Sequence, residues 1–318
     1  MAELLEREDL LAQLEAARAE GGRLVFVGGE AGVGKTALVC EFTSSLADPI
    51  LRGSCESLST PTPLGPFLDV GIAIEGEPRH VASALLHVLE RTHLLVLEDV
   101  HWADEATLDV LRVLGRRIDS TDALVLATYR DDEIDGGHPL RVVLGELTSA
   151  PAVSRVSVPR LSLGAIGTLA EPHGADADAI HRLTQGNAFY VTEILAAGGG
   201  VLPGTVRDAV LARAARLAPE ARLLLDAVSV VPARAELWLL EEVAAAELEH
   251  LDACLASGVL RADGDAIAFR HELARLAVES SLTPHRCRAL NAEILAALPA
   301  GTTRDWRTML PGPATPRP

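Results

Sequence analysis

The sequence predicts an α/β fold, in which a parallel five-stranded sheet carries helices on both faces and is followed by two smaller, mostly helical parts. Short, continuous apolar runs alternate with segments of helical periodicity up to residue 158. Strands that are apolar on both faces are typical of parallel sheets with helices on either side. Such runs stop after Pro159, and a helical region is expected to begin there.

The expected elements can be placed in order. Residues 3–20 alternate leucine with charged residues at helical spacing, which predicts one amphipathic helix before the first strand. A Pro-, Thr- and Gly-rich stretch at 60–66 predicts a loop, and Asp104 is placed to cap the helix that follows it. The strands are expected at 23–28, 49–53, 94–97, 123–128 and 153–158, and the helices between them at 36–42, 79–91 and 104–118.

Breaks in these patterns predict the domain boundaries. The helical region is interrupted at Gly186-Asn187 and again at 198–200. Asp263-Gly264 is a strong turn pair, and the order helix, helix, hairpin, helix around it predicts a winged-helix-like part. We therefore expect an N-terminal helix and linker (1–21), a sheet domain (22–158), a helical lid (159–218), a winged-helix-like domain (219–298) and a disordered, proline-containing tail (299–318).

The single lysine among the 28 Lys and Arg residues, Lys35, lies in the octet Gly29-Glu30-Ala31-Gly32-Val33-Gly34-Lys35-Thr36. This is the P-loop pattern G-x-x-x-x-G-K-[ST]. Backbone N–H groups of such a loop bind phosphates, and a compact ammonium reaches the β and γ oxygens where a planar guanidinium would not fit. Thr36 would bind Mg²⁺ through its hydroxyl, and Ala37 would follow in a helix whose N-terminus adds further amides. The sequence thus predicts a P-loop NTPase.

Two acids follow the third apolar strand. Glu98 and Asp99 could both reach the phosphate end, one acting on Mg²⁺ through water and the other polarising the attacking water. Spacing alone leaves open which acid does which, and a helix cap or a solvated turn is the alternative. Because the strand at 49–53 lies between the P-loop strand and the acidic strand, we assign the chain to the NTPase subclass with an inserted strand, in which the catalytic acid sits beside the metal-binding acid.

The next strand ends in Thr128 and Arg130. A polar or cationic group at this place lies beside the γ-phosphate and can report whether it is present. Arg130 is therefore predicted to act with Lys35, Glu98 and Asp99 in catalysis. A surface ion pair between Arg130 and one of the acids at 131 and 132 is the alternative.

Composition limits the partners. A net charge of −17 opposes broad contact with nucleic acid or an anionic membrane, and 3% aromatic residues leave little for base stacking. No apolar run approaches the ~18–20 residues of a membrane span, and the N-terminus does not resemble a signal peptide. The four cysteines are far apart without metal spacing, so a reduced, cytoplasmic location is expected.

The order of these motifs, together with the segment at 184–193, resembles the ATPase module of large LuxR-type (MalT-like) bacterial transcription regulators. These belong to the STAND class of signal-transducing, AAA-like ATPases. The resemblance spans residues 4–298, and its most specific element beyond the P-loop is His101-Trp102-Ala103-Asp104. It implies a nucleotide with adenine as its base, ATP or ADP. The guanine-reading element N-K-x-D needs a second lysine, which this chain lacks.

The resemblance also implies further site residues. Arg7-Glu8 is similar to a G-R-E element near the adenine, with Glu6 in place of the glycine. Arg130 corresponds to a sensor arginine, and Asn187 lies in a segment similar to the G-N-P-F segment of the helical lid, with Ala188 in place of the proline. His271 corresponds to a histidine that holds the ADP β-phosphate, and a plain helix-start residue is the alternative.

These features predict an ATP-binding switch that hydrolyses ATP slowly and controls a protein partner or its own association. The alternatives are a turnover ATPase, either an AAA-type remodeller or a P-loop kinase, and a non-functional remnant. Full-length members of the resembled family continue into helical repeats and a helix-turn-helix, so a truncated, frame-shifted or split product is expected. Residues 236–298 hold eleven acids against five arginines, which opposes direct DNA binding by the winged-helix-like part.

Overall fold

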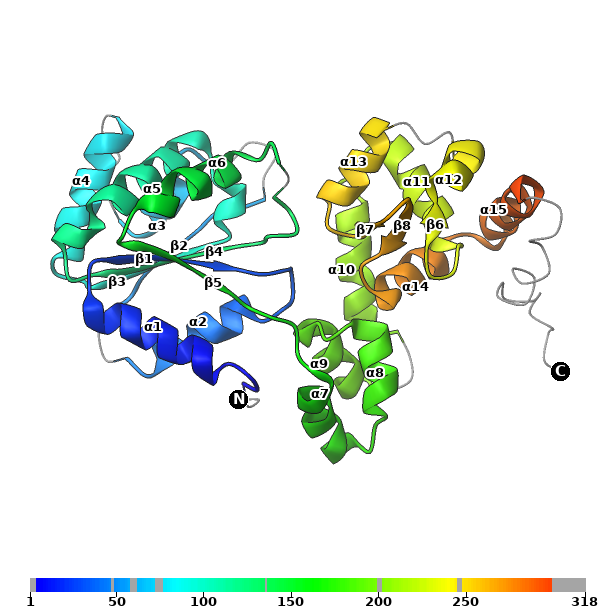
Figure 1. Ribbon diagram of the computed structural model, residues 1–318, viewed down its shortest axis with the longest axis horizontal. Helices are drawn as coiled ribbons and strands as arrows, with labels where there is room; N and C mark the ends of the chain where they lie inside the picture. The colour runs from blue at the N-terminus through cyan, green and yellow to red at the C-terminus, as the bar shows by residue number, and fades with distance from the viewer. Residues whose placement is uncertain are drawn as a thin grey trace. The chain divides into compact units, whose positions relative to one another are not determined.

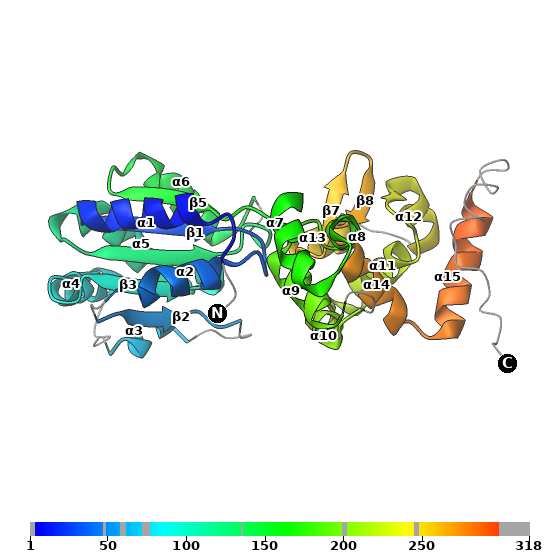
Figure 2. The same ribbon diagram turned by 90° about the horizontal axis from the view of Figure 1, so that it is seen from below.

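The computed structural model describes residues 4–46, 49–57, 62–71, 77–134, 136–198, 202–244 and 248–298. The chain divides into two compact units at the junction between Leu161 and Ser162, and each unit is described by itself (Figures 1 and 2). The predicted tail at 299–318 lies outside the described residues. None of the helices in the described ranges combines the length and the apolar character that crossing a bilayer requires.

The first unit contains the predicted parallel sheet. Its described elements are α1 (Glu8–Glu20), β1 (Arg23–Gly28), α2 (Lys35–Ser44), β2 (Leu51–Ser54), α3 (Gly65–Asp69), α4 (Pro78–Leu89), β3 (Leu94–Glu98), α5 (Glu105–Arg117), β4 (Leu124–Tyr129), α6 (Pro139–Glu146) and β5 (Val153–Ser157). The strands of this sheet in the described part pair in parallel in the order β2-β3-β4-β1-β5. The predicted five-stranded parallel sheet is therefore confirmed.

The order of the strands corrects one inference from the sequence. The strand that lies between β1 and β3 in the sheet is β4. β2, which lies between them along the chain, pairs with β3 and forms the edge of the sheet. The ends of β1, β4 and β3 are thus neighbours, and the loops after them can meet at one site.

Alternate residues of each central strand enter different cores. Leu24 and Phe26 of β1 belong to the same buried cluster as side chains of α4, α5 and α6. Val25 and Val27 belong to the cluster that includes Leu38 of α2. Figure 1 shows α1 and α2 on one face of the sheet and α4, α5 and α6 on the other. This alternation is the period of two that a strand imposes on its side chains.

Beyond shifts of one or two residues at element ends and the unpredicted α6, the first unit differs from the sequence-based expectation in two places. The first helix begins at Glu8, because Glu6 has a left-handed φ of 59° that interrupts the helical backbone. The predicted loop gives way to α3 at Gly65, with Pro66 in the first turn, where a missing N–H leaves no helical hydrogen bond unmade. Asp104 caps α5 as predicted, accepting a hydrogen bond from Ala106 N at 3.0 Å.

The second unit is mostly helical. Its described elements are α7 (Leu163–Ala170), α8 (Ala177–Thr184), α9 (Ala188–Ala196), α10 (Gly204–Ala214), α11 (Pro219–Ser229), β6 (Ala235–Glu236), α12 (Leu237–Ala244), α13 (Leu248–Ala256), β7 (Leu260–Asp263), β8 (Ala266–Phe269), α14 (Glu272–Ser281) and α15 (Pro284–Ala297). The predicted hairpin is confirmed, with β7 and β8 antiparallel and Gly264 at a left-handed φ of 64°. The predicted break before Asn187 is confirmed by Gly186, whose φ is 82°.

One core joins most of this unit. Val210 and Ala214 of α10 lie in the same buried cluster as Leu224 of α11, Phe269 of β8 and Leu290 of α15. α10, which the sequence assigned to the lid, therefore packs with the elements that follow it. The boundary at 218/219 and the winged-helix character of the last part stay predictions.

Candidate nucleotide-binding site

The P-loop (residues 29–36) connects β1 to α2 at the predicted place. Gly29, Gly32 and Gly34 have φ values of 152°, 79° and 108°. Residues other than glycine rarely adopt such values. A Cβ on Gly29 would also lie 2.9 Å from Cγ1 of Val33 and 3.0 Å from the carbonyl oxygen of Val158. The glycines of the octet thus meet a backbone requirement of the loop.

Lys35 is buried within the loop that it belongs to. Its Nζ donates to the carbonyl oxygens of Gly29 at 2.6 Å and Glu30 at 2.9 Å. Burial lowers the pKa of Lys35, while the carboxylates of Asp132 and Asp99 act in the opposite direction. The ammonium is therefore held where phosphate oxygens could replace the two carbonyl groups.

A carboxylate from the segment after β4 also contacts the P-loop. The backbone N–H of Ala31 donates to Oδ1 of Asp132 at 3.2 Å. The position of Asp132 in the sequence suggested only an ion pair with Arg130. Its contact depends on β4 lying beside β1, which the strand order reveals and the residue spacing does not.

The two acids at the end of β3 point to different partners. Asp99 has a left-handed φ of 55°, and its N–H donates to Oγ1 of Thr128 at 3.0 Å. Its Oδ1 lies 3.8 Å from Nε of Arg130. Glu98 Oε1 instead lies 3.4 Å from Nη1 of Arg52 on β2. Asp99 is thus the acid associated with Arg130 and, through its charge, with Lys35.

Arg130 is held by an acid and an aromatic ring. Its Nη1 donates to Oε1 of Glu133 at 2.6 Å, and its guanidinium carbon lies 4.6 Å from the centre of the Trp102 ring. The acids that pair with it are thus Glu133 and Asp99, in place of the acids at 131 and 132 that the sequence suggested. His101 lies beside this group, with Nε2 at 3.4 Å from Oε2 of Glu133. Trp102 of the most specific motif therefore contacts the predicted sensor arginine, and His101 contacts the acid that pairs with it.

Arg7 is buried beneath backbone carbonyl groups. It donates to the carbonyl oxygens of Glu6 at 3.0 Å, Val33 at 3.4 Å and Pro159 at 2.7 Å. Burial lowers the pKa of Arg7, and the charges of Glu6 and Glu8 oppose this. Arg7 thus ties the start of α1 to the P-loop and to the segment after β5, and its contact with an adenine stays a prediction.

Asn187 and His271, the other two predicted contacts, belong to the second unit. Asn187 is fully buried at the start of α9, and His271 immediately precedes α14. The ring of His271 packs edge-on against Tyr190, three residues after Asn187, with 5.0 Å between the ring centres. The structure brings these two residues into one region of the second unit, and their role in binding a nucleotide stays a prediction.

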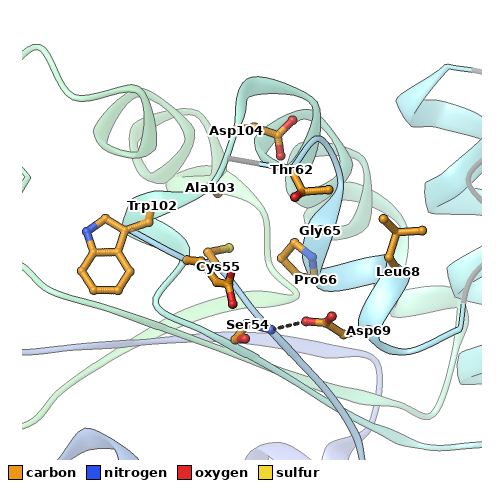
Figure 3. Close-up of a pocket in the computed structure, with 11 residues that line it drawn as sticks. Ser54, Cys55, Thr62, Gly65, Pro66, Leu68, Asp69, Trp102, Ala103 and Asp104 are labelled. Atoms are coloured by element: carbon orange, nitrogen blue, oxygen red, sulfur yellow. Dashed lines mark hydrogen bonds between the residues drawn. The ribbon is translucent and has the colours of Figure 1, made fainter. Parts of the chain in front are cut away.

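A small pocket lies at the end of β2, next to the most specific motif (Figure 3). Its volume of about 130 Å³ would hold roughly four water molecules. Figure 3 shows the N–H of Ser54 donating to Asp69, at 3.1 Å, among side chains that include Cys55 and Trp102. Burial, aided by Asp104, Asp99 and Asp69, raises the pKa of the Cys55 thiol to about 12. This pocket is too small for a nucleotide.

The donors available near the P-loop suit a hard cation. Thr36 is exposed in the first turn of α2 and presents a hydroxyl. The ranges that the structure describes contain no group of three or more His, Cys, Asp or Glu side chains arranged to hold a metal. Mg²⁺ is usually bound by one or two protein oxygens, waters and substrate phosphates. Thr36 with one acid fits that pattern.

Comparison with known protein families agrees with the P-loop in the first unit. Residues 4–126 match the model of a protein family described as AAA ATPase domain. No curated protein matches the chain. The comparison supports an AAA ATPase domain in the first unit, built around the P-loop described above.

Comparison with solved structures gives matches at low sequence identity. A Walker-type ATPase of Pyrococcus abyssi is 14% identical, with a TM-score of 0.60, and the match covers 86% of this chain and 96% of that one. A signal transduction ATPase with numerous domains (STAND) from Pyrococcus horikoshii, which has a tetratricopeptide repeat sensor, is 14% identical with a TM-score of 0.44. That match covers 93% of this chain and 45% of the other, so this chain spans under half of that protein's length.

Proposed function

We propose that this chain is a nucleotide switch that binds ATP and ADP and hydrolyses ATP slowly, as the ATPase part of a LuxR-type regulator. The observation that carries the proposal is the buried Lys35 inside a glycine loop, with the charges of Asp99 and Arg130 acting on it. Lys35 follows β1, Asp99 follows β3 and Arg130 follows β4, and these three strands are neighbours in the sheet. This is the combination of groups that phosphoryl transfer uses.

The residues of the loop have distinct roles in this proposal. The backbone N–H groups of residues 29–37 bind phosphate oxygens, and the ammonium of Lys35 exchanges the carbonyl oxygens of Gly29 and Glu30 for them. Thr36 and one acid hold Mg²⁺, which supplies positive charge to the phosphates when it is bound. We assign Asp99 to the phosphate end, because Glu98 lies beside Arg52.

Arg130 gives this site a means of distinguishing ATP from ADP. Its guanidinium is held by Glu133 and Trp102, and a γ-phosphate would compete for it with a larger charge. Shifting a two-state equilibrium from 1:99 to 99:1 requires about a 10⁴-fold preference of the ligand for one state. A charge difference read jointly by Lys35, Mg²⁺ and Arg130 could contribute much of this preference.

The second unit completes the proposal. Asn187 would contact the nucleotide from the lid segment, and His271 would hold the β-phosphate in the ADP state, as the family resemblance implies. The winged-helix-like part would then act as a clamp, controlling a protein partner or self-association. Its excess of acids over arginines between 236 and 298 favours this role over DNA binding.

Steady-state hydrolysis tests the proposal against a turnover enzyme. We expect purified chain with Mg²⁺ and saturating ATP to hydrolyse below about 0.01 s⁻¹, as GTPase switches do without an activator, while kinases reach ~1–100 s⁻¹. We also expect ADP release to limit the rate, so that a first turnover precedes a slower steady state. Multiple turnover near 1 s⁻¹ without a partner would favour the turnover ATPase.

A further inference from the structure

Glu30 is an acid within an anion-binding loop. It occupies the second position of the P-loop, and its side chain is only 9% exposed. A buried carboxylate near the phosphate site would repel a nucleotide unless a cation compensated its charge. Arg160 is such a cation: its Nε and Nη2 donate to Oε2 of Glu30 at 3.0 and 2.6 Å.

Arg160 belongs to a segment that we call the connector, residues 158–161. It follows β5 and leads into the second unit, which begins at Ser162. Arg160 is thus the cation for the P-loop acid and is also one residue from the end of the first unit. No sequence motif selects Arg160, which lies 130 residues from Glu30 in the chain.

The connector contacts the P-loop region in two further places. The N–H of Val158 donates to the carbonyl oxygen of Gly28 at 2.8 Å, just before the octet. Arg7 bridges the carbonyl oxygens of Val33 and Pro159. Contacts at residues 28, 30 and 33 therefore join the P-loop region to three successive connector residues, directly or through Arg7.

Occupancy of the loop should change the strength of these contacts. When the Lys35 ammonium moves from the carbonyl oxygen of Glu30 to a phosphate, Glu30 loses that hydrogen bond to a cation. Glu30 also gains the negative charge of the phosphate nearby. The added anion strengthens the negative potential at Arg160, so the guanidinium is held more tightly beside Glu30. With its side chain held at Glu30, residue 160 would open less often to solvent, and its amide would exchange more slowly.

We propose that the Glu30–Arg160 ion pair links nucleotide occupancy of the P-loop to the connector that leads into the second unit. This link rests on the proposed function, because it needs a nucleotide in the loop. Arg160 is a positioning residue in this account: it acts through Glu30 and does not touch the phosphates.

Hydrogen exchange of the connector tests the link. Wild-type chain saturated with ADP and Mg²⁺ is expected to exchange the amides of residues 160–163 at least threefold more slowly than chain without nucleotide. Arg160→Gln should abolish this difference at saturating ADP, while Arg160→Lys should keep part of it. Arg155→Gln is the matched control, because Arg155 lies on β5 and donates to Leu144 O and Thr148 Oγ1, away from the P-loop.

A double-mutant cycle isolates the ion pair. Arg160→Gln should weaken ADP binding by roughly threefold to tenfold, because it removes a cation that offsets the charge of Glu30. In a Glu30→Gln background the same change should have little effect. Equal losses in both backgrounds, or a connector that responds to ADP as well in Arg160→Gln as in wild type, would overturn the link.

The outcomes separate the link from the proposed function. Failure of the wild-type chain to bind ADP or ATP would overturn the proposed function and the link with it. Nucleotide binding without any connector response in the wild type would overturn the link alone. Arg160→Lys keeps these tests decisive if Arg160→Gln does not fold.

Discussion

The backbone N–H of Ala31 donates to Oδ1 of Asp132 at 3.2 Å, so a carboxylate rests against the loop that the sequence predicts to bind phosphate. The same carboxylate is the nearby charge that most strongly raises the pKa of Lys35 against burial. Asp132 therefore stabilises the ammonium form of Lys35, and it would repel a phosphate that bound at this loop.

Asp132→Asn should tighten ADP binding. Removing one negative charge beside the phosphates is worth about 1 kcal/mol at a partly exposed site, or roughly fivefold in affinity. Fluorescence titration with a labelled ADP at low and high salt would measure this, and the gain should shrink at high salt. Asp131→Asn is the control, since Asp131 is exposed and has a weaker influence on Lys35. Weaker binding by Asp132→Asn would contradict the interpretation.

Arg130→Ala should slow hydrolysis far more than it weakens ADP binding. A cation that stabilises charge in the transition state contributes about 10²–10³ in rate, whereas ADP lacks the γ-phosphate that Arg130 would contact. Single-turnover hydrolysis and ADP titration give the two quantities. Arg141→Ala, at a guanidinium that donates to Ile134 O, is the control. Equal losses in rate and in ADP affinity would remove Arg130 from the sensor role.

The sequence predicted the parts of the site that occur as continuous motifs. Lys35 and Asp99 were identified because octet patterns and apolar strands ending in acids are local. Asp132 and Arg160 were missed as site residues, because their contacts arise from segments that are neighbours only in the folded sheet. Glu133 was missed although its contact with Arg130 is local, three residues away, because Asp131 and Asp132 lie closer in the sequence. No periodicity indicates which loop after a strand will touch another.

The fold shows the same division. Strand positions could be predicted because buried parallel strands are continuous apolar runs. The edge position of β2 could not be predicted. Along the chain, β2 lies between β1 and β3, which suggests a central strand, although its exposed Arg52 and Ser54 fit an edge. The helix at Gly65 was hidden because glycine and proline favour loops in sequence, although both are accepted in a first helical turn.

Gly34→Ala tests the backbone requirement of the loop without a steric clash. A Cβ at Gly34 meets nothing within 4 Å, so only the φ of 108° opposes alanine. The cost should be about 1–2 kcal/mol, read as a lower thermal midpoint of the first unit. Gly145→Ala is the control, because Gly145 lies in α6 with the same open space and no left-handed φ. A Gly34→Ala chain as stable as wild type would contradict the claim that the φ of Gly34 disfavours alanine.

Stability should fall at alkaline pH because of Cys55. Burial raises its pKa from 9.0 to about 12 in the folded chain. Above pH 9 the unfolded thiol loses its proton while the folded thiol keeps it, so each pH unit favours unfolding by up to about 1.4 kcal/mol. Thermal midpoints between pH 8 and 10.5 should therefore fall less steeply for Cys55→Ala. Cys40→Ala, at an exposed thiol, should leave the slope unchanged.

The most direct test of the switch is the nucleotide that remains bound to the purified chain. Wild-type protein, denatured after gel filtration and analysed by chromatography, is predicted to release ADP at close to one molecule per chain. Lys35→Ala, which removes the ammonium from the P-loop, is predicted to release none. Wild-type chain that retains no nucleotide and turns over ATP rapidly, or Lys35→Ala chain that retains as much ADP as wild type, would contradict the account.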